Sequence, residues 1–289
     1  MNFRKKHLPA FVFGLLCLIW GSTWMAIKLG LEESPPFLSA GIRFAIAGLV
    51  LAALVKVRRV SLSYSARVWY LMGLTGVIIG LGYGAIYWGE QYISSGLSAV
   101  LFATLTLFVA LFSHFAITDE RLRLLKVAGI LIGFVGVVLI FADRISLDSS
   151  SWLGCAALLF SSAIMAAGSV LIKKELIQVN PIVLTGVQMN LAAMMLLICG
   201  LLLERVDDFL ITMMSVGAVL YLSLFGTVFA FVMYYWLLRR VQVTRVSLIV
   251  LITPLVAVFL GWLLLGEIVN FRMIVGSGLV LGGVGVALR

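Results

Sequence analysis

Residues 181–203 are PIVLTGVQMNLAAMMLLICGLLL, a stretch of 23 residues without a charged side chain. An α-helix rises 1.5 Å per residue, so about 20 predominantly apolar residues are needed to cross the hydrocarbon core of a bilayer. This stretch is long enough and apolar enough to predict one membrane-spanning helix.

The same pattern recurs along the whole chain and predicts ten spans. The expected spans are Leu8–Ile27, Pro36–Val55, Val68–Gly89, Leu97–Ile117, Val127–Ala142, Trp152–Ile172, Pro181–Leu203, Met213–Leu238, Val246–Gly266 and Met273–Leu288. The fifth and tenth runs are short for a bilayer. We therefore expect their helices to begin earlier, at Leu124 and Phe271.

The composition supports an all-α integral membrane protein. Of the 289 residues, 63% are hydrophobic and 11% are charged, whereas a soluble domain is about 45–50% apolar and about 25% charged. Too little polar surface is present to cover a water-soluble particle. Ten spans with short connections also leave no room for a separate soluble domain.

The net charge of +9 comes from small groups of Lys and Arg between the apolar runs. These groups form no basic face or aromatic-basic motif, so the charge predicts topology and no nucleic-acid partner. When loops are assigned alternately to the two sides, sixteen Lys and Arg fall on the side of the termini and four on the other. The positive-inside rule then predicts that both termini are cytoplasmic.

The chain matches itself at a nearly constant offset, which predicts an internal duplication. The matched pairs are Thr106 with Thr253, Glu120 with Glu267, Gly129 with Gly276, Gly136 with Gly283, Lys28 with Lys173, Pro36 with Pro181, and Gly41 with Gly186. We expect one five-span repeat in residues 1–145 and a second in residues 146–289. Because five is odd, the second repeat would be inverted in the membrane, as in many secondary transporters that work by alternating access.

Four segments form a recognisable set: Ile19-Trp20-Gly21-Ser22-Thr23-Trp24, Gly41-Ile42-Arg43-Phe44, Thr118-Asp119-Glu120-Arg121-Leu122 and Leu265-Gly266-Glu267. They resemble the EamA type of the drug/metabolite transporter superfamily, and the resemblance covers essentially the whole chain. The resemblance implies a ten-span inner-membrane exporter built from two inverted five-span repeats, with relatives that move amino acids, other small metabolites or drugs outward. The family often has a hinge proline in each half. Here Pro254 is the hinge candidate, but its repeat equivalent is Leu107.

Two helical stripes carry the candidate residues of a substrate cavity. Trp20, Thr23 and Trp24 share one face of the first span, because residues three and four apart are neighbours on a helix. In the third span a stripe of hydroxyls and rings ends in a carboxylate, and its members are Tyr83, Tyr87 and either Glu90 or Gln91. Such stripes favour a polar cavity for a ring-bearing or amphipathic solute, although packing and interfacial aromatics are the alternative. An interfacial belt is the favoured interpretation of Tyr234 and Tyr235.

Polar residues inside the spans add further candidates. Arg43 is a permanent charge within the second span, and it is expected to pair with Glu90 or a substrate carboxylate unless it snorkels outward as a structural residue. Gln188 and Asn190 are costly amides that face different sides of one helix, and Asn190 is the preferred cavity candidate. His114 could relay protons, but a lone histidine is more often packed or interfacial.

Other residues favour structural interpretations. Glu120 and Glu267 lie at span ends, where a carboxylate can cap the next helix. The spacings Gly129-xxx-Gly133 and Gly278-xxx-Gly282 predict close helix contacts or a homodimer face. The three cysteines are isolated in apolar runs, and no cofactor or metal site is predicted.

The leading hypothesis is a secondary transporter that exports small organic metabolites. These would be amino acids, similar amphipathic solutes or drugs. Its partners would be the substrate and the lipid bilayer. The sequence holds no glycine-rich loop of the GxxxxGK(S/T) type, so an ion or substrate gradient must drive transport. A sensor or accessory protein is the alternative. A membrane-embedded enzyme is disfavoured because the two histidines are far apart and form no HExxH motif.

Overall fold

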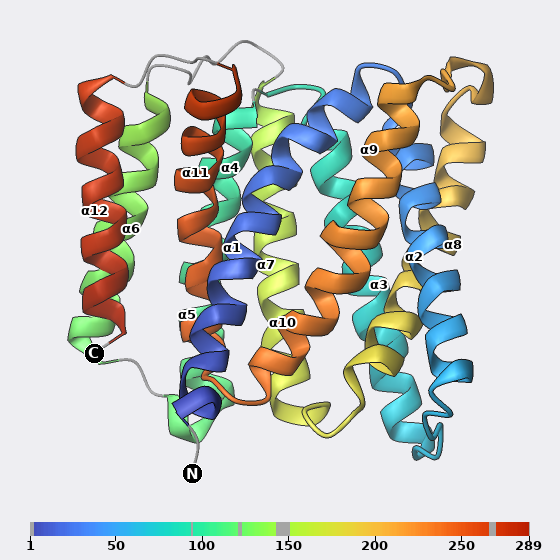
Figure 1. Cartoon of the computed structure of the whole chain (residues 1–289), viewed down its shortest axis with the longest axis horizontal. Helices are drawn as coiled ribbons and strands as arrows, with labels where there is room; N and C mark the ends of the chain where they lie inside the picture. Colours follow the sequence, from blue (N-terminus) through green and yellow to red (C-terminus); the bar gives the residue numbers. More distant parts are fainter. Residues whose placement is uncertain (1–2, 94, 121–122, 143–150, 266–269, 289) are drawn as a thin grey trace.

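The computed structural model describes residues 3–93, 95–120, 123–142, 151–265 and 270–288, and this part of the chain is helical without strands. The helices stand side by side in one bundle, with both chain ends near one edge (Figure 1). The helices are α1 Phe3–Leu31, α2 Pro36–Val57, α3 Ala66–Gly89, α4 Ser95–Ala103, α5 Leu105–Ala116, α6 Leu124–Phe141, α7 Ser151–Glu175, α8 Pro181–Leu203, α9 Met213–Ser223, α10 Ala230–Leu238, α11 Val243–Leu265 and α12 Phe271–Ala287.

The ten expected spans are all present as apolar helical segments. Among the described residues, eight are long and apolar enough to cross a membrane, and two shorter apolar helices cover Leu124–Ile140 and Phe271–Ala287. The predicted early starts of these two helices, at Leu124 and Phe271, are confirmed. Two spans are not uniform helices. The fourth is divided at Thr104 into α4 and α5, and the eighth contains a π-helical turn, η4 Leu224–Phe229, between α9 and α10.

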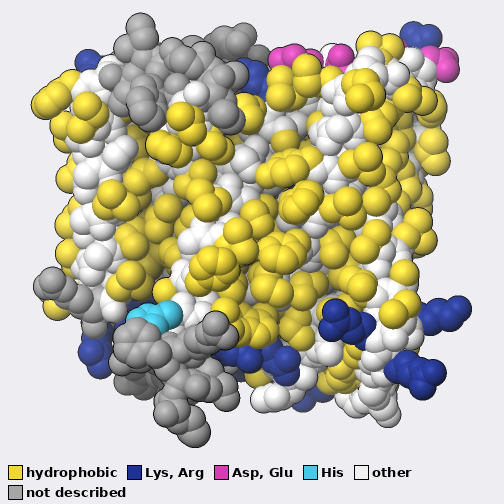
Figure 2. Space-filling view, viewed as in Figure 1, with side chains coloured by type: hydrophobic (Ala, Val, Ile, Leu, Met, Phe, Trp, Pro, Cys, Tyr) yellow, Lys and Arg dark blue, Asp and Glu magenta, His cyan; other side chains and the backbone are white. Residues whose placement is uncertain are grey.

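The outer surface of the bundle suits a bilayer. Figure 2 shows apolar side chains over the middle of the visible face, with Lys and Arg gathered along the edge that carries the N-terminus. The Asp and Glu visible in this view lie at the opposite edge. An apolar band between two charged edges is the surface that lipid contact requires, since the hydrocarbon core offers no partner for a polar group.

Contacts between the two halves are reciprocal, as two copies of one unit would produce. On α6 and α12, Gly129 faces Gly283, and their repeat counterparts Gly276 and Gly136 face each other. A Cβ added to Gly136 would lie 2.6 Å from the Gly276 carbonyl oxygen, so only glycine permits this approach. The expected boundary at 145/146 and the helix-capping interpretation of Glu267 fall outside the described residues.

The expected contact within the bundle is found for the glycine pair of α6 but not for that of α12, whose alternative use in a homodimer face stays a prediction. Gly129 and Gly133 do lie against α12. Gly278 and Gly282, however, have no atom within 4 Å of an added Cβ. The contact face of α12 carries Gly276 and Gly283 instead, because a seven-residue separation keeps both on the side that meets α6.

Glutamates cap the N-termini of helices contributed by the other half. Both carboxylate oxygens of Glu204 accept from α2, from the Phe37 and Leu38 N–H groups at 2.7 and 2.8 Å. Glu120 accepts from the Val243 N–H of α11 at 2.8 Å and from the Thr244 N–H at 3.2 Å. A carboxylate stabilises the free N–H groups of a helix start. Glu120 is thus structural, as expected, but the helix that it caps is α11 and not the next helix, α6.

The contact between α6 and α12 can be tested with neighbouring glycines. Gly283→Ala places a methyl group 2.5 Å from the Gly129 carbonyl oxygen, so the helices must separate, and we expect the free energy of unfolding to fall by about 1–3 kcal/mol. Gly282→Ala is the matched control, because nothing lies within 4 Å of its Cβ. Thermal unfolding in detergent gives the melting temperatures of both variants. Equal melting temperatures for the two variants would contradict the close helix contact.

Candidate functional site

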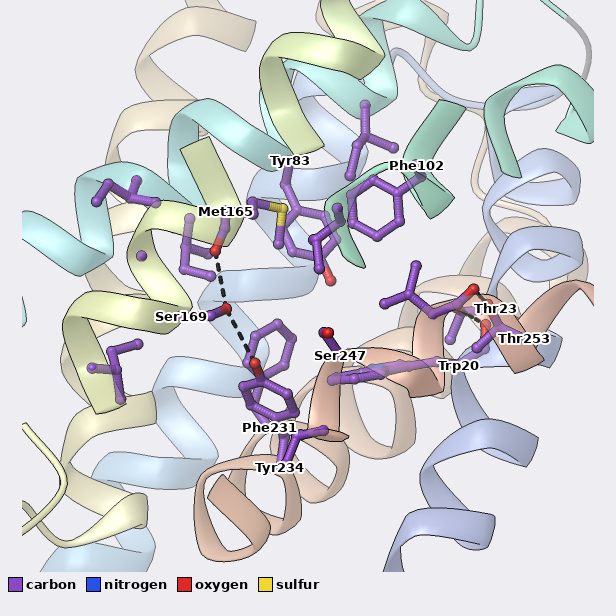
Figure 3. Close-up of a pocket in the computed structure, with 18 of the residues that line it drawn as sticks. Trp20, Thr23, Tyr83, Phe102, Met165, Ser169, Phe231, Tyr234, Ser247 and Thr253 are labelled. Atoms are coloured by element: carbon purple, nitrogen blue, oxygen red, sulfur yellow. Dashed lines mark hydrogen bonds between the residues drawn. The ribbon is translucent and has the colours of Figure 1, made fainter. Parts of the chain in front are cut away.

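A cavity lies inside the bundle, and residues from both halves of the chain line it (Figure 3). Its lining is Trp20, Thr23, Trp24 and Ile27 of α1, Arg43 of α2, Thr75, Ile78, Ile79, Tyr83 and Ile86 of α3, Phe102 of α4, Leu105 of α5, Met165, Gly168, Ser169 and Ile172 of α7, Phe231, Tyr234 and Tyr235 of α10, and Val246, Ser247, Val250 and Thr253 of α11. Aromatic rings and aliphatic chains dominate this surface, and hydroxyl groups interrupt it.

The first-span stripe forms one wall of the cavity. The indole N–H of Trp20 donates to the Gly226 carbonyl at 3.3 Å, and its ring lies 5.6 Å from that of Phe231. The ring of Trp24 meets Phe102 edge-on at 5.6 Å. The structure therefore brings Trp20, Thr23 and Trp24 together at the cavity, as the helical spacing predicts.

Arg43 is the charged residue of the lining, and its side chain is 1% exposed. Its Nε donates to the Thr227 hydroxyl at 2.9 Å and its Nη1 to the Tyr87 hydroxyl at 3.1 Å. No ion pair within the described part of the chain includes Arg43, so the expected pairing with Glu90 is not found. Snorkelling is also wrong, because the guanidinium is enclosed by protein. Tyr87 lies behind the lining and holds Arg43 rather than facing the cavity.

A chain of hydrogen bonds holds the wall made by α10. Tyr235 donates to Oε1 of Gln188 at 2.7 Å, and Nε2 of Gln188 donates to the Thr75 hydroxyl at 2.9 Å. Tyr234 donates to Ser169 at 3.1 Å. Both tyrosines are buried, so the interfacial-belt interpretation of Tyr234 and Tyr235 is wrong. Their depth follows from the packing of α10 against α8, which sequence periodicity does not report.

Of the two amides, Gln188 is buried and supports the cavity, whereas Asn190 is exposed and does not reach it. The Asn190 side chain donates to the Gly186 carbonyl of its own helix at 2.8 Å and fills the space beside Gly48 of α2. Gln188 is fully buried and bridges α3 and α10. The two-residue spacing placed these amides on different faces, but only the position of the neighbouring helices decides which face meets the cavity wall.

Two further candidates lie away from the cavity. Gln91 is exposed, and its amide nitrogen donates to the Trp88 carbonyl at 3.2 Å. His114 is absent from the lining, and its ring packs edge-on against Phe115 at 5.0 Å. Neither the cavity role of Gln91 nor a proton path from His114 into the cavity is supported by this placement.

Pro254 lies inside α11, and the helix continues through it. Proline has no N–H, so the Val250 carbonyl one turn earlier loses its backbone donor. The neighbouring hydroxyl of Thr253 donates to that carbonyl at 3.0 Å. This substitution of a side-chain donor for a backbone donor is how a membrane helix tolerates proline. The hinge role of Pro254 stays a prediction.

Glu90 follows the last residue of α3, outside the span, and caps that helix at its C-terminal end. Its Oε1 is buried and has no hydrogen-bond partner among the described residues. Burial raises the pKa of the Glu90 carboxyl from 4.5 to about 8, against a smaller lowering by Lys28. Glu90 does not line the cavity, and a neutral carboxyl is the favoured form at pH 7.

These observations define the class of the protein: a multi-pass helical membrane protein with an aromatic, hydroxyl-bearing cavity between its two halves. Sites of this composition bind small molecules that combine an apolar body with a few polar groups.

Comparison with known proteins supplies the family. The model of the EamA-like transporter family matches residues 8–142 and again residues 152–289. The chain is 30% identical to the uncharacterized transporter YoaV of Bacillus subtilis, covering 92% of both chains. It is 32% identical to the uncharacterized inner membrane transporter YedA of Escherichia coli, covering 96% of this chain and 94% of the relative. A solved crystal structure matches 96% of both chains with a TM-score of 0.83 at 22% identity, which shows a shared fold.

The chain belongs to the EamA-like transporter family. The double match also agrees with the duplication expected from the sequence, with one copy in each half of the chain. The protein is accordingly a membrane transporter.

The bridge formed by Gln188 can be measured with a double-mutant cycle. Gln188→Leu and Tyr235→Phe each leave a buried partner unsatisfied, so the double variant should be less destabilised than the sum of the single variants by about 1 kcal/mol. Asn190→Ala combined with Tyr235→Phe is the control and should be additive, because Asn190 bonds only within its own helix among the described contacts. Chemical unfolding in detergent gives the four free energies. Additivity in both cycles would refute the bridge.

The buried Glu90 carboxyl predicts a pH effect on stability. The pKa of this carboxyl is about 8 in the folded protein, above the usual 4.5. Between about pH 5 and pH 8 the Glu90 carboxyl is therefore ionised in the unfolded chain but protonated in the folded chain, so wild-type stability should fall as the pH rises. Glu90→Gln removes this titration. The melting temperature of the variant relative to wild type should therefore rise across this range. A difference that stays constant from pH 5 to pH 8 would show that the carboxyl is solvated.

Proposed function

We propose that this protein is a secondary transporter that exports small amphipathic organic metabolites across the inner membrane by alternating access. The observation that carries the proposal is the central cavity, whose lining alternates rings and hydroxyls and comes from both halves of the chain. A solute bound between two halves can be exposed to either side when one half moves against the other.

The end of the bundle that carries the termini is closed by polar contacts between helices. Nζ of Lys173 in α7 donates to the Leu238 and Val241 carbonyls at the end of α10, at 2.6 and 2.8 Å. Glu120 caps the start of α11 beside it. These contacts hold the tips of α7, α10 and α11 together. Alternating access would require them to open, and each consists of a few hydrogen bonds that water can replace.

The orientation of the chain and the identity of the membrane are inferred from charge and from the relatives. Lys and Arg lie along the edge with the termini (Figure 2), which supports a cytoplasmic location for that edge. The relative from Escherichia coli is named an inner membrane transporter. A family of transporters also fits a protein that is not an enzyme. Sensing or accessory function without transport is the competing hypothesis.

Solute flux through the cavity is the decisive measurement. In sealed proteoliposomes, wild-type protein should give saturable flux when pooled amino acids, nucleosides, aromatic acids and amphipathic dyes are tested with and without a pH gradient. Trp24→Ala removes a ring from the cavity wall, so flux at low substrate concentration should fall about tenfold or more, as loss of an aromatic binding contact does.

Trp152→Ala is the matched control. Trp152 is 65% exposed on the outer face of the bundle, so flux in this variant should stay within about twofold of wild type. Folded wild-type protein that moves none of these solutes would favour the sensor or accessory hypothesis. Equal loss in the two tryptophan variants would place the solute path elsewhere.

A further inference from the structure

The charge of the cavity lining is one-sided. Among the described residues that line it, Arg43 alone is charged at neutral pH, and none is Asp, Glu, Lys or His. Their other polar groups are the indole N–H groups of Trp20 and Trp24 and hydroxyls such as those of Thr23 and Ser247. A positive charge in surroundings of low dielectric attracts an anion and repels a cation far more strongly than it would in water.

Arg43 is held in place by neutral groups only. Its guanidinium lies 5.2 Å from the ring centres of both Phe44 and Tyr83, and it donates to the hydroxyls of Thr227 and Tyr87. The two hydrogen bonds use two of the five N–H groups of the guanidinium. None of the described residues supplies a carboxylate to this cation. A buried cation without a counter-charge is costly, and an anionic ligand would reduce that cost.

The π-helical turn η4 positions the hydroxyl groups of Thr227 and Ser223 against Arg43. The Thr227 hydroxyl donates to the Leu222 carbonyl five residues earlier at 2.8 Å, while it accepts from Arg43. The Ser223 hydroxyl donates to the backbone carbonyl of Arg43 at 3.0 Å. An extra residue in the turn thus points Thr227 at the guanidinium, and such π-bulges occur frequently at functional sites.

A side chain at position 226 would crowd one nitrogen of Arg43. A Cβ at Gly226 would lie 3.4 Å from Nη2 of Arg43 and 3.0 Å from Cγ2 of Thr23. The Gly226 carbonyl accepts the indole N–H of Trp20, which itself lines the cavity. Space beside Nη2 is therefore bordered by Thr23 and Trp20, next to the aromatic wall formed by Phe231 and Tyr234.

We propose that Arg43 binds the carboxylate of the transported solute, and that the cavity selects organic monoanions with an aromatic or similarly apolar body. The planar guanidinium offers paired donors that match a carboxylate, and the described hydrogen bonds of its side chain use Nε and Nη1 but not Nη2. The surrounding rings take the apolar body of the solute. A cationic amphipath of the same size meets the same rings but is repelled by Arg43.

The test compares three ligands with the same ring and chain and different charge: 3-phenylpropanoate, 3-phenylpropanamide and 3-phenylpropylamine. Titration calorimetry of the purified full chain in detergent at pH 7 gives each dissociation constant. Wild-type protein should bind the acid about tenfold or more tightly than the amide, and the amine least well. Equal affinities for acid and amide, tightest binding of the amine, or no binding of any of the three by folded protein would overturn the proposal.

Variants locate the preference at Arg43. Arg43→Gln should bring the acid and the amide within about twofold of each other, whereas Arg43→Lys, which keeps the charge, should retain part of the preference. If Arg43→Gln does not fold, Gly226→Ala provides the second variant. Its methyl group approaches Nη2 without removing the charge, so affinity for the acid should fall more than affinity for the amide. A folded Arg43→Gln that still prefers the acid, or a Gly226→Ala that weakens both equally, would contradict the assignment.

This inference rests on the proposed transport function, because it names the class of solute that occupies the same cavity. Binding and flux separate the two. Acid-selective binding without flux in proteoliposomes would contradict transport and leave the anion site standing. Flux of another solute class by a protein without acid preference would contradict the anion site and leave transport standing.

Discussion

Polar groups within an apolar bilayer must be satisfied inside the protein, and the rest of this structure depends on that constraint. Glu120 and Glu204 cap helix starts from the opposite half of the chain, where soluble proteins could use water. Thr253 replaces the donor that Pro254 lacks. The amide of Gln188 accepts a hydrogen bond from Tyr235 and donates one to Thr75. The contacts of Glu120, Glu204 and Gln188 join helices that are distant in the sequence, so satisfying these polar groups also determines which helices are neighbours.

Close packing at the periphery leaves room for a cavity at the centre. Glycines permit backbone contact between α6 and α12, and the side chain of Asn190 fills the space beside Gly48 where α8 meets α2. The central helices instead carry large rings, which meet edge-on or at a tilt around the cavity, as Trp24 does with Phe102 and Trp20 with Tyr234. Aromatic pairs with these offset or edge-on geometries are favourable contacts and hold a defined wall. Rigid peripheral pairs and a ring-lined interior together suit a protein that binds a solute between its two halves.

Helical spacing correctly predicted which residues of a single helix share one face. The stripe of Trp20, Thr23 and Trp24 lines the cavity as expected, because one helical face must turn toward the bundle. Spacing was insufficient where a neighbouring helix decides the outcome. Spacing favours Asn190 over Gln188 and an interfacial belt for Tyr234 and Tyr235, although both tyrosines form the cavity wall. Gly278 and Gly282 of α12 likewise follow the spacing of a contact pair but face away from α6, which leaves the homodimer face as a prediction.

The sequence by itself determined ten apolar helices, their approximate ends and a family resemblance, and it predicts an internal duplication. These properties follow from helix length, hydrophobicity and repeated residues, all of which are local or periodic along the chain. Only the tertiary structure decided the partners of Arg43. Its neighbours Tyr87 and Thr227 are 44 and 184 residues away, and a π-helical turn that no sequence period predicts brings Thr227 to the guanidinium. A charge inside a span signals importance, but whether it is neutralised, exposed or left for a ligand depends on long-range packing.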